Sequence, residues 1–581
     1  MIILGVNAYH PNSSACLLIN GELKVAIEEE RINRMKNWSG LPIQAIDYCL
    51  KSQNIKLSEV DNIAINQNFY ANIFSKLKYS FLKKPDFSFI IKSLNNKIKR
   101  QNLLKLLQQK LGKIKNNCKL VGIEHHLSHI SYAFFDSNYD TSANVSVDGF
   151  GDFASTTWGL GKKEKLIIDN KILFPHSLGV FYESFTQFLG FTNYGEEYKV
   201  MGLSSLGNST ETNKIKKIIN LKKNGKFELN LDYFNHYKKN ITYSFNNAIP
   251  KIDNLYSNKF INLFGTPRNK NDKLTNDHIN LASSVQKVYE EVLFHILNFV
   301  YQKYKVENLT LSGGCAQNSL ANGKILKNTN FKSLFVPSNP GDGGGCVGAA
   351  YSLWKNLTDR KPINTLGGYL GNSYNNKEIR NVLDYNKDKI ESENCIYYFI
   401  EKEQLLCDFV AKSLTENKVI GWFQGKMEWG PRALGNRSIL ADPRNANVKD
   451  ILNLKIKRRE SFRPFAPSIL FEDANHWFNN FNDEEPYMSR VLQFKEEKYS
   501  LVPGVVHIDG SGRLQTVKEN NNPIYYNLIK SFKKITGVPI ILNTSFNENE
   551  PIVLTPEHAL NCFLRTKMDI LVLGNWVIVR N

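Results

Sequence analysis

The sequence lacks the features that mark secreted or membrane-spanning proteins. Its eight cysteines are scattered and none forms a CxxC pair, which argues against a disulfide framework or a zinc ribbon. No run of about 18 apolar residues occurs, and the strand expected over residues 2–6 starts without a basic leader. We therefore expect a cytoplasmic protein with reduced thiols and no membrane span.

Acidic residues are scarce beside basic ones, at 55 against 74, so that the formal net charge is +19. Between residues 71 and 120, thirteen Lys or Arg stand against one acid, Asp86. No nucleic-acid module signature accompanies this charge, and the Lys- and Asn-rich composition favours a solvated basic face. We expect no nucleic-acid partner, while attraction to anionic polymers or membrane surfaces stays open.

The length of 581 residues exceeds the ~100–200 residues usual for one domain, and 42% hydrophobic residues can fill sizeable cores. Short apolar strands at residues 2–6, 119–123 and 144–147 alternate with helical segments such as 279–303, which predicts an α/β fold. No short repeat is visible. We expect a first domain over 1–357, a linker over 358–397 and a second domain over 398–581.

Two histidines and two carboxylates form a candidate metal site. His125 and His129 are four residues apart after an expected strand, so on a helix they share one face, as two metal ligands require. Asp148 ends a strand and Asp342 lies on a glycine loop. Each residue alone has a structural explanation. Together they predict a mononuclear divalent transition metal, iron, manganese or zinc, rather than calcium.

Glycine-rich loops accompany the candidate metal ligands. Residues 312–318 follow an expected strand and open a helix, so that backbone N–H groups would face an anion. Residues 341–348 repeat this arrangement, and with residues 148–152 they form the recurring pattern of a split, actin-like ATPase fold. Tight packing of strand on helix would also require glycine. The candidate nucleotide contacts are Gly149, Gly151, Gly313, Gly314 and Asn318.

Arginines gather between residues 429 and 467, among Gly, Pro and Phe. An unpaired buried guanidinium costs several kcal/mol, whereas a charge-assisted bond to phosphate contributes roughly 1.5–3 kcal/mol. The stretch therefore predicts a phosphate site. Internal pairing with Glu428, Asp442 and Glu460 is the alternative. The arginines concerned are Arg432, Arg437, Arg444, Arg459 and Arg463.

Aromatic and histidine residues of the second half allow two interpretations each. Trp422, Trp429 and Phe546 could stack on adenine, although a buried core role is more common for such residues. His507, close to Arg513, could line a channel or serve as a hydrogen-bonded loop residue.

Ordered motifs along the whole chain resemble the nodulation-type O-carbamoyltransferases, whose relatives act on aminoglycosides, cephalosporins and other hydroxylated small molecules. The resemblance implies an N-terminal actin-like domain of two lobes, similar to the threonylcarbamoyl transferase of tRNA modification. It also implies a C-terminal YrdC-like domain. The matching segments are residues 28–34, 125–129, 194–203, 430–438, 462–467, 507–510 and 543–547.

The resemblance implies an ATP-dependent reaction in two steps. The YrdC-like domain combines carbamoyl phosphate with ATP, with Mg²⁺ as the expected counter-ion, to form carbamoyl adenylate. The actin-like domain then transfers the carbamoyl group to a hydroxyl of a sugar or a secondary metabolite. Iron is the metal that the family leads us to expect at His125, His129, Asp148 and Asp342, and homodimers are common among its members.

Residue matches to the family give further expectations. His10 matches a histidine near the acceptor site, although the usual His-Asp-Ala-Ser is replaced by residues 10–13, His-Pro-Asn-Ser, which leaves the base assignment open. Lys457 is a candidate catalytic lysine or a solvated one. The catalytic candidates are His10, Arg432 and Lys457. The candidate contacts to nucleotide or carbamoyl phosphate are Lys199, Arg432, Arg437, Ser438, Arg459, Arg463, Asn543 and Ser545.

A tRNA threonylcarbamoyl-type enzyme is the alternative function, because both domain types occur in that pathway and the chain is basic. Such an enzyme uses threonine and bicarbonate and needs no arginine cluster for carbamoyl phosphate, so the cluster favours O-carbamoylation. A non-catalytic binding protein is a third reading, disfavoured because no expected metal ligand is missing. The sequence does not identify the acceptor.

Overall fold

The computed structural model describes residues 1–83, 102–237, 248–460 and 462–581. Asp86 of the basic segment and Ser461 of the arginine-rich stretch lie outside the described residues. Within the described parts, no helix has both the length and the apolar character needed to cross a bilayer. All eight cysteines are free thiols.

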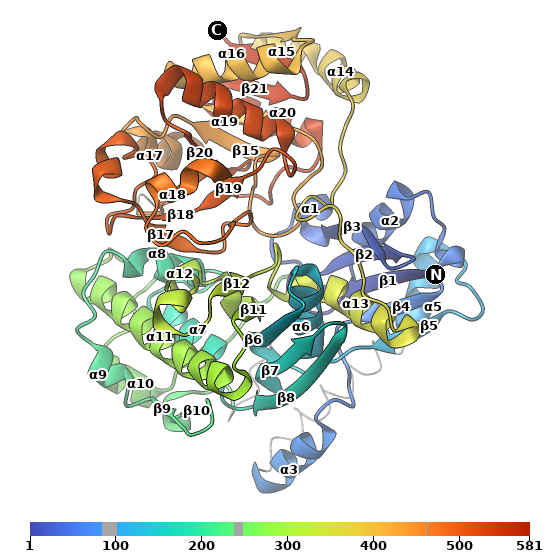
Figure 1. Cartoon of the computed structure of the whole chain (residues 1–581), viewed down its shortest axis with the longest axis vertical. Coiled ribbons are helices and arrows are strands. Elements are labelled where there is room, and N and C mark those ends of the chain that lie inside the picture. The colour runs from blue at the N-terminus through green and yellow to red at the C-terminus, as the bar shows by residue number, and fades with distance from the viewer. Residues whose placement is uncertain (84–101, 238–247, 461) are drawn as a thin grey trace. The chain divides into compact units, whose positions relative to one another are not determined.

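The chain divides into two compact units (Figure 1). Unit 1 comprises residues 1–321 and 325–366, and unit 2 comprises residues 322–324 and 367–581. Both units mix helices with sheets, as the alternation of strands and helices predicted.

Unit 1 contains two five-stranded sheets with the same topology. In the first, β1, β2 and β3 form an antiparallel meander, and β4 and β5 add in parallel on the other side of β1. The second repeats this with β6, β7 and β8, and then β11 and β12. The strands are β1 (Ile2–Asn7), β2 (Ser14–Ile19), β3 (Glu22–Glu28), β4 (Asn62–Ile65), β5 (Lys119–Gly122), β6 (Thr141–Gly151), β7 (Ala154–Lys162), β8 (Lys165–Leu173), β11 (Asn308–Ser312) and β12 (Ser333–Phe335).

Two helices lie between these sheets. The helix α13 (Gly345–Thr358) packs on β1, β2 and β4, the helix α6 (His125–Asp136) packs on β6, β7 and β11, and the two helices pack on each other. Both helices are covered on several sides and are therefore buried around most of their circumference. A Cβ atom on Gly348 would lie 1.7 Å from the carbonyl oxygen of Ser128, so glycine sets how closely α13 approaches α6.

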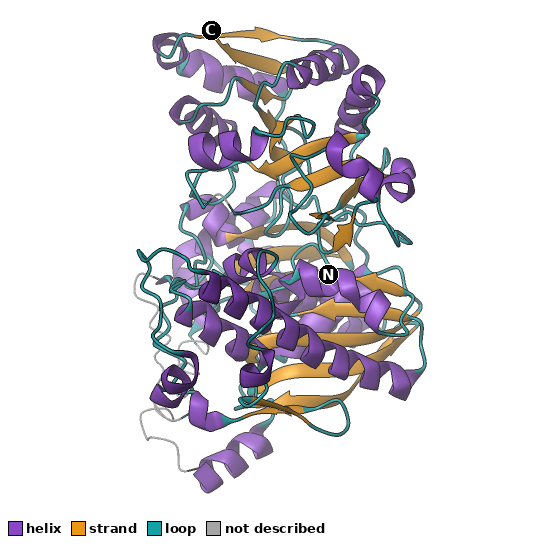
Figure 2. Cartoon of the chain, turned by 90° about the vertical axis from the view of Figure 1, so that its left-hand side faces the viewer, coloured by secondary structure: helices purple, strands orange, loops and turns teal. Residues whose placement is uncertain are grey.

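The remaining elements of unit 1 surround this arrangement, and Figure 2 shows helices lying against its strands. The helices α7 and α11 also pack on β6. The elements are α1 (Glu29–Asn33), α2 (Ile43–Ser52), α3 (Ile73–Lys83), α5 (Leu103–Leu111), α7 (Leu178–Phe188), α8 (Glu197–Ser204), α9 (Thr212–Ile215), β9 (Ile219–Leu221), β10 (Phe227–Leu229), α10 (Asn258–Phe264), α11 (Asn276–Tyr304) and α12 (Ser319–Asn328).

Unit 2 is built on a mixed eight-stranded sheet of order β13-β22-β21-β14-β15-β20-β16-β19, with a separate hairpin of β17 and β18. Its strands are β13 (Cys395–Phe399), β14 (Ile420–Phe423), β15 (Arg437–Ala441), β16 (Ala466–Leu470), β17 (Val491–Gln493), β18 (Ser511–Arg513), β19 (Gln515–Val517), β20 (Ile540–Ser545), β21 (Ile570–Leu573) and β22 (Trp576–Arg580). Its helices are α14 (Asn376–Tyr385), α15 (Lys387–Ser392), α16 (Glu403–Thr415), α17 (Val448–Asp450), α18 (Ala474–Trp477), α19 (Pro523–Thr536) and α20 (Pro556–Arg565).

The segment 358–397, expected to be a linker, is largely folded. It contains α14, α15 and the start of β13, and its residues Ile379, Leu383 and Ile390 are buried in the core of unit 2. Each of these helices turns a narrow apolar face to the core and leaves a polar face in water. The average composition of the segment 358–397 is therefore like that of a linker, although its apolar residues recur at the spacing of a helix.

We expect Gly348→Ala to destabilise unit 1. Alanine normally stabilises a helix interior relative to glycine by roughly 1 kcal/mol, but here its Cβ would press on the Ser128 carbonyl, and overpacking costs about 1–3 kcal/mol or more. Calorimetry should show a lower Tm. Gly149→Ala is the control, because no atom lies within 4 Å of its added Cβ. An unchanged Tm in Gly348→Ala would contradict the close packing.

Candidate functional site

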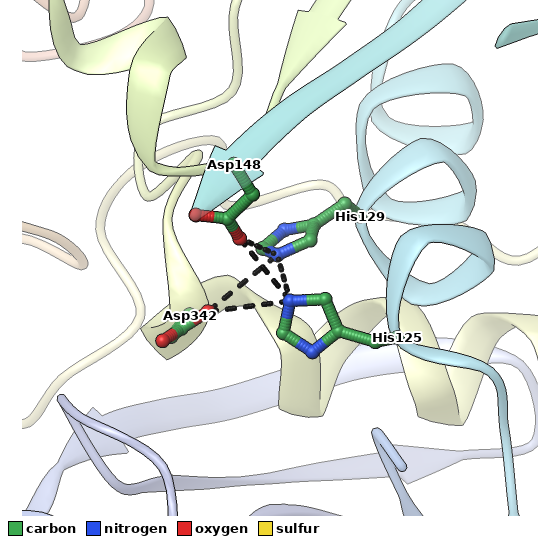
Figure 3. Close-up of side chains that lie close together, drawn as sticks. All are labelled: His125, His129, Asp148 and Asp342. Atoms are coloured by element: carbon green, nitrogen blue, oxygen red, sulfur yellow. Dashed lines mark hydrogen bonds and ion pairs between the residues drawn. The ribbon is translucent and has the colours of Figure 1, made fainter. Parts of the chain in front are cut away.

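Four side chains converge where the layers of unit 1 meet (Figure 3). His125 and His129 lie on the first turns of α6, Asp148 lies near the end of β6, and Asp342 lies in the loop before α13. One ligand atom from each residue lies within 4.8 Å of those of the other three. The structure therefore brings together all four candidates for a metal site.

The distances between these atoms suit a common ion. The Nε2 atoms of His125 and His129 lie 3.1 Å apart, and each lies 3.1 Å from Asp148 Oδ2. Asp342 Oδ1 lies 3.5 Å and 3.7 Å from the same nitrogens. Ligand atoms about 2.1 Å from one ion are separated by roughly 3.0–3.4 Å, so the residues fit a transition metal.

Protonation compensates the negative charge of this cluster. Burial lowers the pKa of His129, but hydrogen bonds with Asp148 and Asp342 outweigh burial and raise it to about 9. Burial raises the pKa of Asp148, yet its hydrogen bonds with the two histidines bring it well below the usual value. Asp148 is thus held ionised beside a protonated His129, and a divalent cation would displace that proton.

Backbone N–H groups of the glycine loops hold Asp148. Its Oδ1 atom accepts hydrogen bonds from Gly149 N–H at 2.8 Å and Gly314 N–H at 3.2 Å, which leaves Oδ2 for the histidines. At Gly151, a Cβ atom would lie 2.0 Å from the ring of His125. Three of the glycines expected to contact nucleotide therefore shape the carboxylate–histidine cluster.

The other candidate nucleotide contacts of unit 1 have structural partners. Gly313 has φ +87°, and its Cβ would lie 2.2 Å from the Val147 carbonyl oxygen, so close strand packing requires glycine. Asn318 accepts a hydrogen bond from Ala321 N–H and caps α12. Lys199 forms an ion pair with Glu196 at 2.6 Å.

The sequence did not predict a buried network of polar residues around Glu28, next to the loop that carries Asp342. Glu28 Oε1 accepts a hydrogen bond from Asn339 at 3.0 Å, and Glu28 Oε2 lies 2.9 Å from Arg31. A Cβ on Gly343, next to Asp342, would lie 2.8 Å from Glu28 Oε1. Glu28 therefore fixes the loop that carries a metal candidate. Residues 28–31 did belong to a matching motif, which was the available signal.

Two further histidines adjoin the cluster with different roles. The His10 ring stacks on His125 with centroids 5.1 Å apart, and its Nδ1 lies 3.8 Å from Asp342 Oδ2, so His10 lies at the edge of the site. His126 points elsewhere, toward the Ser146 hydroxyl and the Ala154 carbonyl. Burial lowers the pKa of His126 to about 4, which keeps it neutral.

In unit 2, Arg437 departs from the prediction of a phosphate ligand. It is buried, and its guanidinium donates hydrogen bonds to the carbonyl oxygens of Gln424, Gly425, Asn436 and Asn372. It also lies 3.6 Å from the centre of the Phe423 ring. Backbone carbonyl groups of the segment between β14 and β15, together with that of Asn372, thus satisfy this cation.

Two other arginines follow the alternative of internal pairing. Arg444 forms a bidentate ion pair with Asp442, the shortest distance being 2.7 Å. Arg463 lies 2.7 Å from Glu460. Glu428 does not pair with arginine, because its Oε1 accepts hydrogen bonds from three backbone N–H groups of the loop before β15.

Arg432 and Arg459 lie near a third arginine, Arg513, which the sequence analysis did not assign to the phosphate site. Burial, together with the positive charges of Arg432 and Arg459, brings the pKa of Arg513 well below its usual value. The Nε atom of Arg513 is buried without a hydrogen-bond partner. Neighbouring guanidinium groups repel one another, and an anion bound among them would offset that repulsion. Arg513 could have been found from its place after the motif 507–510.

The remaining candidates of unit 2 are largely engaged within the protein. Lys457 is buried, and its Nζ donates to the carbonyl oxygens of Ser545 and Asn547, so it is not the solvated lysine that was considered. Ser438 accepts a hydrogen bond from Gly435 N–H. Asn543 donates to Ala433 and Gln515.

His507 belongs to a short hydrogen-bond chain. Its Nδ1 lies 3.1 Å from the Ser511 hydroxyl, which donates to Asp509 at 2.6 Å. Burial lowers the pKa of His507 to about 4, so the ring is neutral. Trp422 and Phe546 are fully buried in the core, which confirms the core interpretation of these aromatic residues.

Family models match both halves of the chain. The model described as carbamoyltransferase N-terminus matches residues 2–351, and the one described as carbamoyltransferase C-terminus matches residues 411–580.

Three curated proteins illustrate the similarity. A Synechocystis protein described as uncharacterized protein sll1178 is 38% identical over 100% of this chain and 96% of its own length. Nodulation protein NolNO of Sinorhizobium fredii is 35% identical over 98% and 79%. The 3'-hydroxymethylcephem-O-carbamoyltransferase of Amycolatopsis lactamdurans is 32% identical over 46% and 48%.

Among solved structures, HypF of T. kodakarensis aligns with 62% of this chain and 48% of its own, at 13% identity and a TM-score of 0.30. A score of this size does not establish a shared fold.

We expect the purified protein to bind one divalent transition metal per chain through the four converging residues. His129→Gln and Asp342→Asn each remove a ligand and should lower the metal content at least tenfold, measured by inductively coupled plasma mass spectrometry. His126→Gln is the control, because its ring faces Ser146 and Ala154. Equal metal content in all three variants would exclude the site.

We expect opposite stability effects at two arginines of unit 2, the buried Arg437 and the half-buried Arg513. Arg437→Gln removes a cation that satisfies several carbonyl groups and should cost roughly 3–5 kcal/mol of unfolding free energy, as breaking a buried charged network does. Arg513→Gln removes repulsion with Arg432 and Arg459 and should leave stability unchanged or higher. Urea unfolding without phosphate measures both. The same loss in both variants would contradict the distinction.

Proposed function

The chain belongs to the carbamoyltransferase family and is an enzyme of carbamoyl transfer, and from this premise we propose that it is an ATP-dependent O-carbamoyltransferase. Its donor substrates are carbamoyl phosphate and ATP, and its acceptor is a hydroxyl of a sugar or secondary metabolite. The relative from Amycolatopsis, named an O-carbamoyltransferase, supports transfer to oxygen. The observation that carries the donor assignment is the cluster of Arg432, Arg459 and Arg513.

The first half-reaction is assigned to unit 2, as a YrdC-like domain. Water hydrolyses carbamoyl phosphate to carbamate and inorganic phosphate. A carbamate oxygen then attacks the α-phosphorus of ATP and breaks its bond to the β-phosphate oxygen, giving carbamoyl adenylate and pyrophosphate. Negative charge grows on the departing phosphate groups. Arg513, whose cation is disfavoured by burial and by Arg432 and Arg459, is stabilised by that charge. Lys457 and Glu428 hold the adjoining loops in place.

The second half-reaction is assigned to unit 1, as an actin-like domain whose two sheets of equal topology form its lobes. The acceptor hydroxyl attacks the carbamoyl carbon, AMP leaves, and the hydroxyl proton passes to a base. When bound by His125, His129, Asp148 and Asp342, the metal, with iron expected, would act as a Lewis acid. His10 is the proposed base, because it lies beside the cluster with Asp342 near enough to stabilise an imidazolium.

The nucleotide contacts of unit 1 are proposed for the N–H groups around Asp148. The N–H groups of Gly149 and Gly314 are bonded to its carboxylate, so a nucleotide phosphate would meet the other N–H groups of these loops. A tRNA threonylcarbamoyl-type enzyme is the less favoured function, because bicarbonate and threonine give the arginine cluster of unit 2 no phosphate to bind.

The decisive experiment omits the acceptor. The protein incubated with ATP and carbamoyl phosphate should release pyrophosphate and accumulate carbamoyl adenylate, detected by an enzyme-coupled assay and by mass spectrometry. Arg432→Ala and Arg513→Ala should lower the rate at least ~10²-fold, as loss of a charge-stabilising donor does. His129→Gln should keep pyrophosphate release, because the cluster of unit 1 acts only in transfer.

Arg380→Ala is the matched control for the arginine variants, since Arg380 is exposed and pairs with Asp384. Pyrophosphate release from threonine and bicarbonate, but not from carbamoyl phosphate, would favour the tRNA-type enzyme. Equal rates for Arg432→Ala, Arg513→Ala and the parent would refute the donor site.

A further inference from the structure

Helix α3 of unit 1 carries an exposed apolar face that the proposed reaction does not use. The exposed fractions are 85% for Phe74, 60% for Leu77 and 83% for Phe81. Spacings of three and seven residues place the three side chains on one face of a helix. Isolated exposed apolar residues are ordinary, but a contiguous group of this size marks an interaction surface. We refer to Phe74, Leu77 and Phe81 as the α3 patch.

The opposite face of α3 anchors the helix to unit 1. Tyr79 makes edge-to-face contacts with Phe153 and Phe174, at centroid distances of 5.7 Å and 5.1 Å. Before the helix, Asn72 donates a hydrogen bond to the Asp152 carbonyl at 2.8 Å. These contacts turn the α3 patch away from the protein. Figure 1 shows α3 at the lower edge of unit 1, beyond β8.

The positive charge around the α3 patch indicates which kind of partner would bind there. Lys78 is exposed at its flank, and α3 contains no acidic residue. The segment 71–120 has thirteen basic residues and one acid in its sequence. Two copies meeting at α3 would bring like charges together, whereas an anionic surface would attract them. Phe and Leu on one face with Lys beside them is the composition of helices that lie in a membrane interface.

We propose that the α3 patch docks the protein on an anionic lipid surface, with Phe74 and Phe81 inserted at the boundary of headgroups and acyl chains. This inference rests on exposure and charge and is independent of the proposed reaction. An enzyme held at such a surface reaches acceptor hydroxyls that the surface itself carries.

Sedimentation with sucrose-loaded vesicles tests the proposal. The parent protein should bind vesicles of phosphatidylcholine with 30% phosphatidylglycerol, and it should bind pure phosphatidylcholine at least tenfold more weakly. Phe74→Ser and Phe81→Ser should each lower the partition coefficient on the anionic vesicles severalfold, and the double variant at least tenfold. Tyr385→Ser is the matched control, since Tyr385 is 88% exposed on α14 of unit 2.

Pyrophosphate release without vesicles, measured on the same variants, checks that they are folded and separates this inference from the proposed reaction. Equal binding by the double variant and the parent would overturn the proposal, because charge alone would then account for attraction. Light scattering that finds a parent dimer, converted to a monomer by Phe74→Ser with no vesicle binding, would also overturn it and assign the patch to a second copy.

Discussion

The structure of unit 1 depends on the need to satisfy one buried carboxylate, Asp148. A carboxylate removed from water requires partners for both oxygens. The N–H groups of Gly149 and Gly314 satisfy Oδ1, and the imidazoles of His125 and His129 satisfy Oδ2. Because these partners come from two strand ends and one helix, the requirement fixes where β6, β11 and α6 meet. At Gly314 an added Cβ atom would lie 2.9 Å from Asp148 Oδ1, so glycine permits the close approach there.

The duplicated topology explains why a polar site can exist in the middle of this unit. The helices α6 and α13 follow β5 and β12, the last strands of the two equivalent sheets. The first turns of α6 provide the histidines, and the loop before α13 provides Asp342. His10 follows β1, and Asp148 lies near the end of β6, the equivalent first strands. Equivalent positions of the two sheets thus face each other across the helical layer, and the four converging side chains and His10 gather there.

Unit 2 handles positive charge in three different ways. Arg437 is neutralised by backbone carbonyl dipoles, and Arg444 and Arg463 are neutralised by nearby acids. Arg432, Arg459 and Arg513 instead destabilise one another. A bound anion would lower the free energy of the last arrangement, because it would offset the repulsion between like charges. Residue type alone therefore did not indicate which arginines pair within the protein.

The sequence by itself determined the α/β class, the strands that carry the site, the four side chains that converge in unit 1 and the family to which the chain belongs. These depend on local periodicity and on motifs whose order the chain preserves. Only the folded structure revealed the duplicated sheets and the inclusion of residues 376–399 in unit 2. It also showed which arginines are paired within the protein and which repel one another. Strand pairing and charge compensation join residues that are far apart in the chain. A local sequence pattern therefore cannot predict which strand or charged group becomes the partner of another.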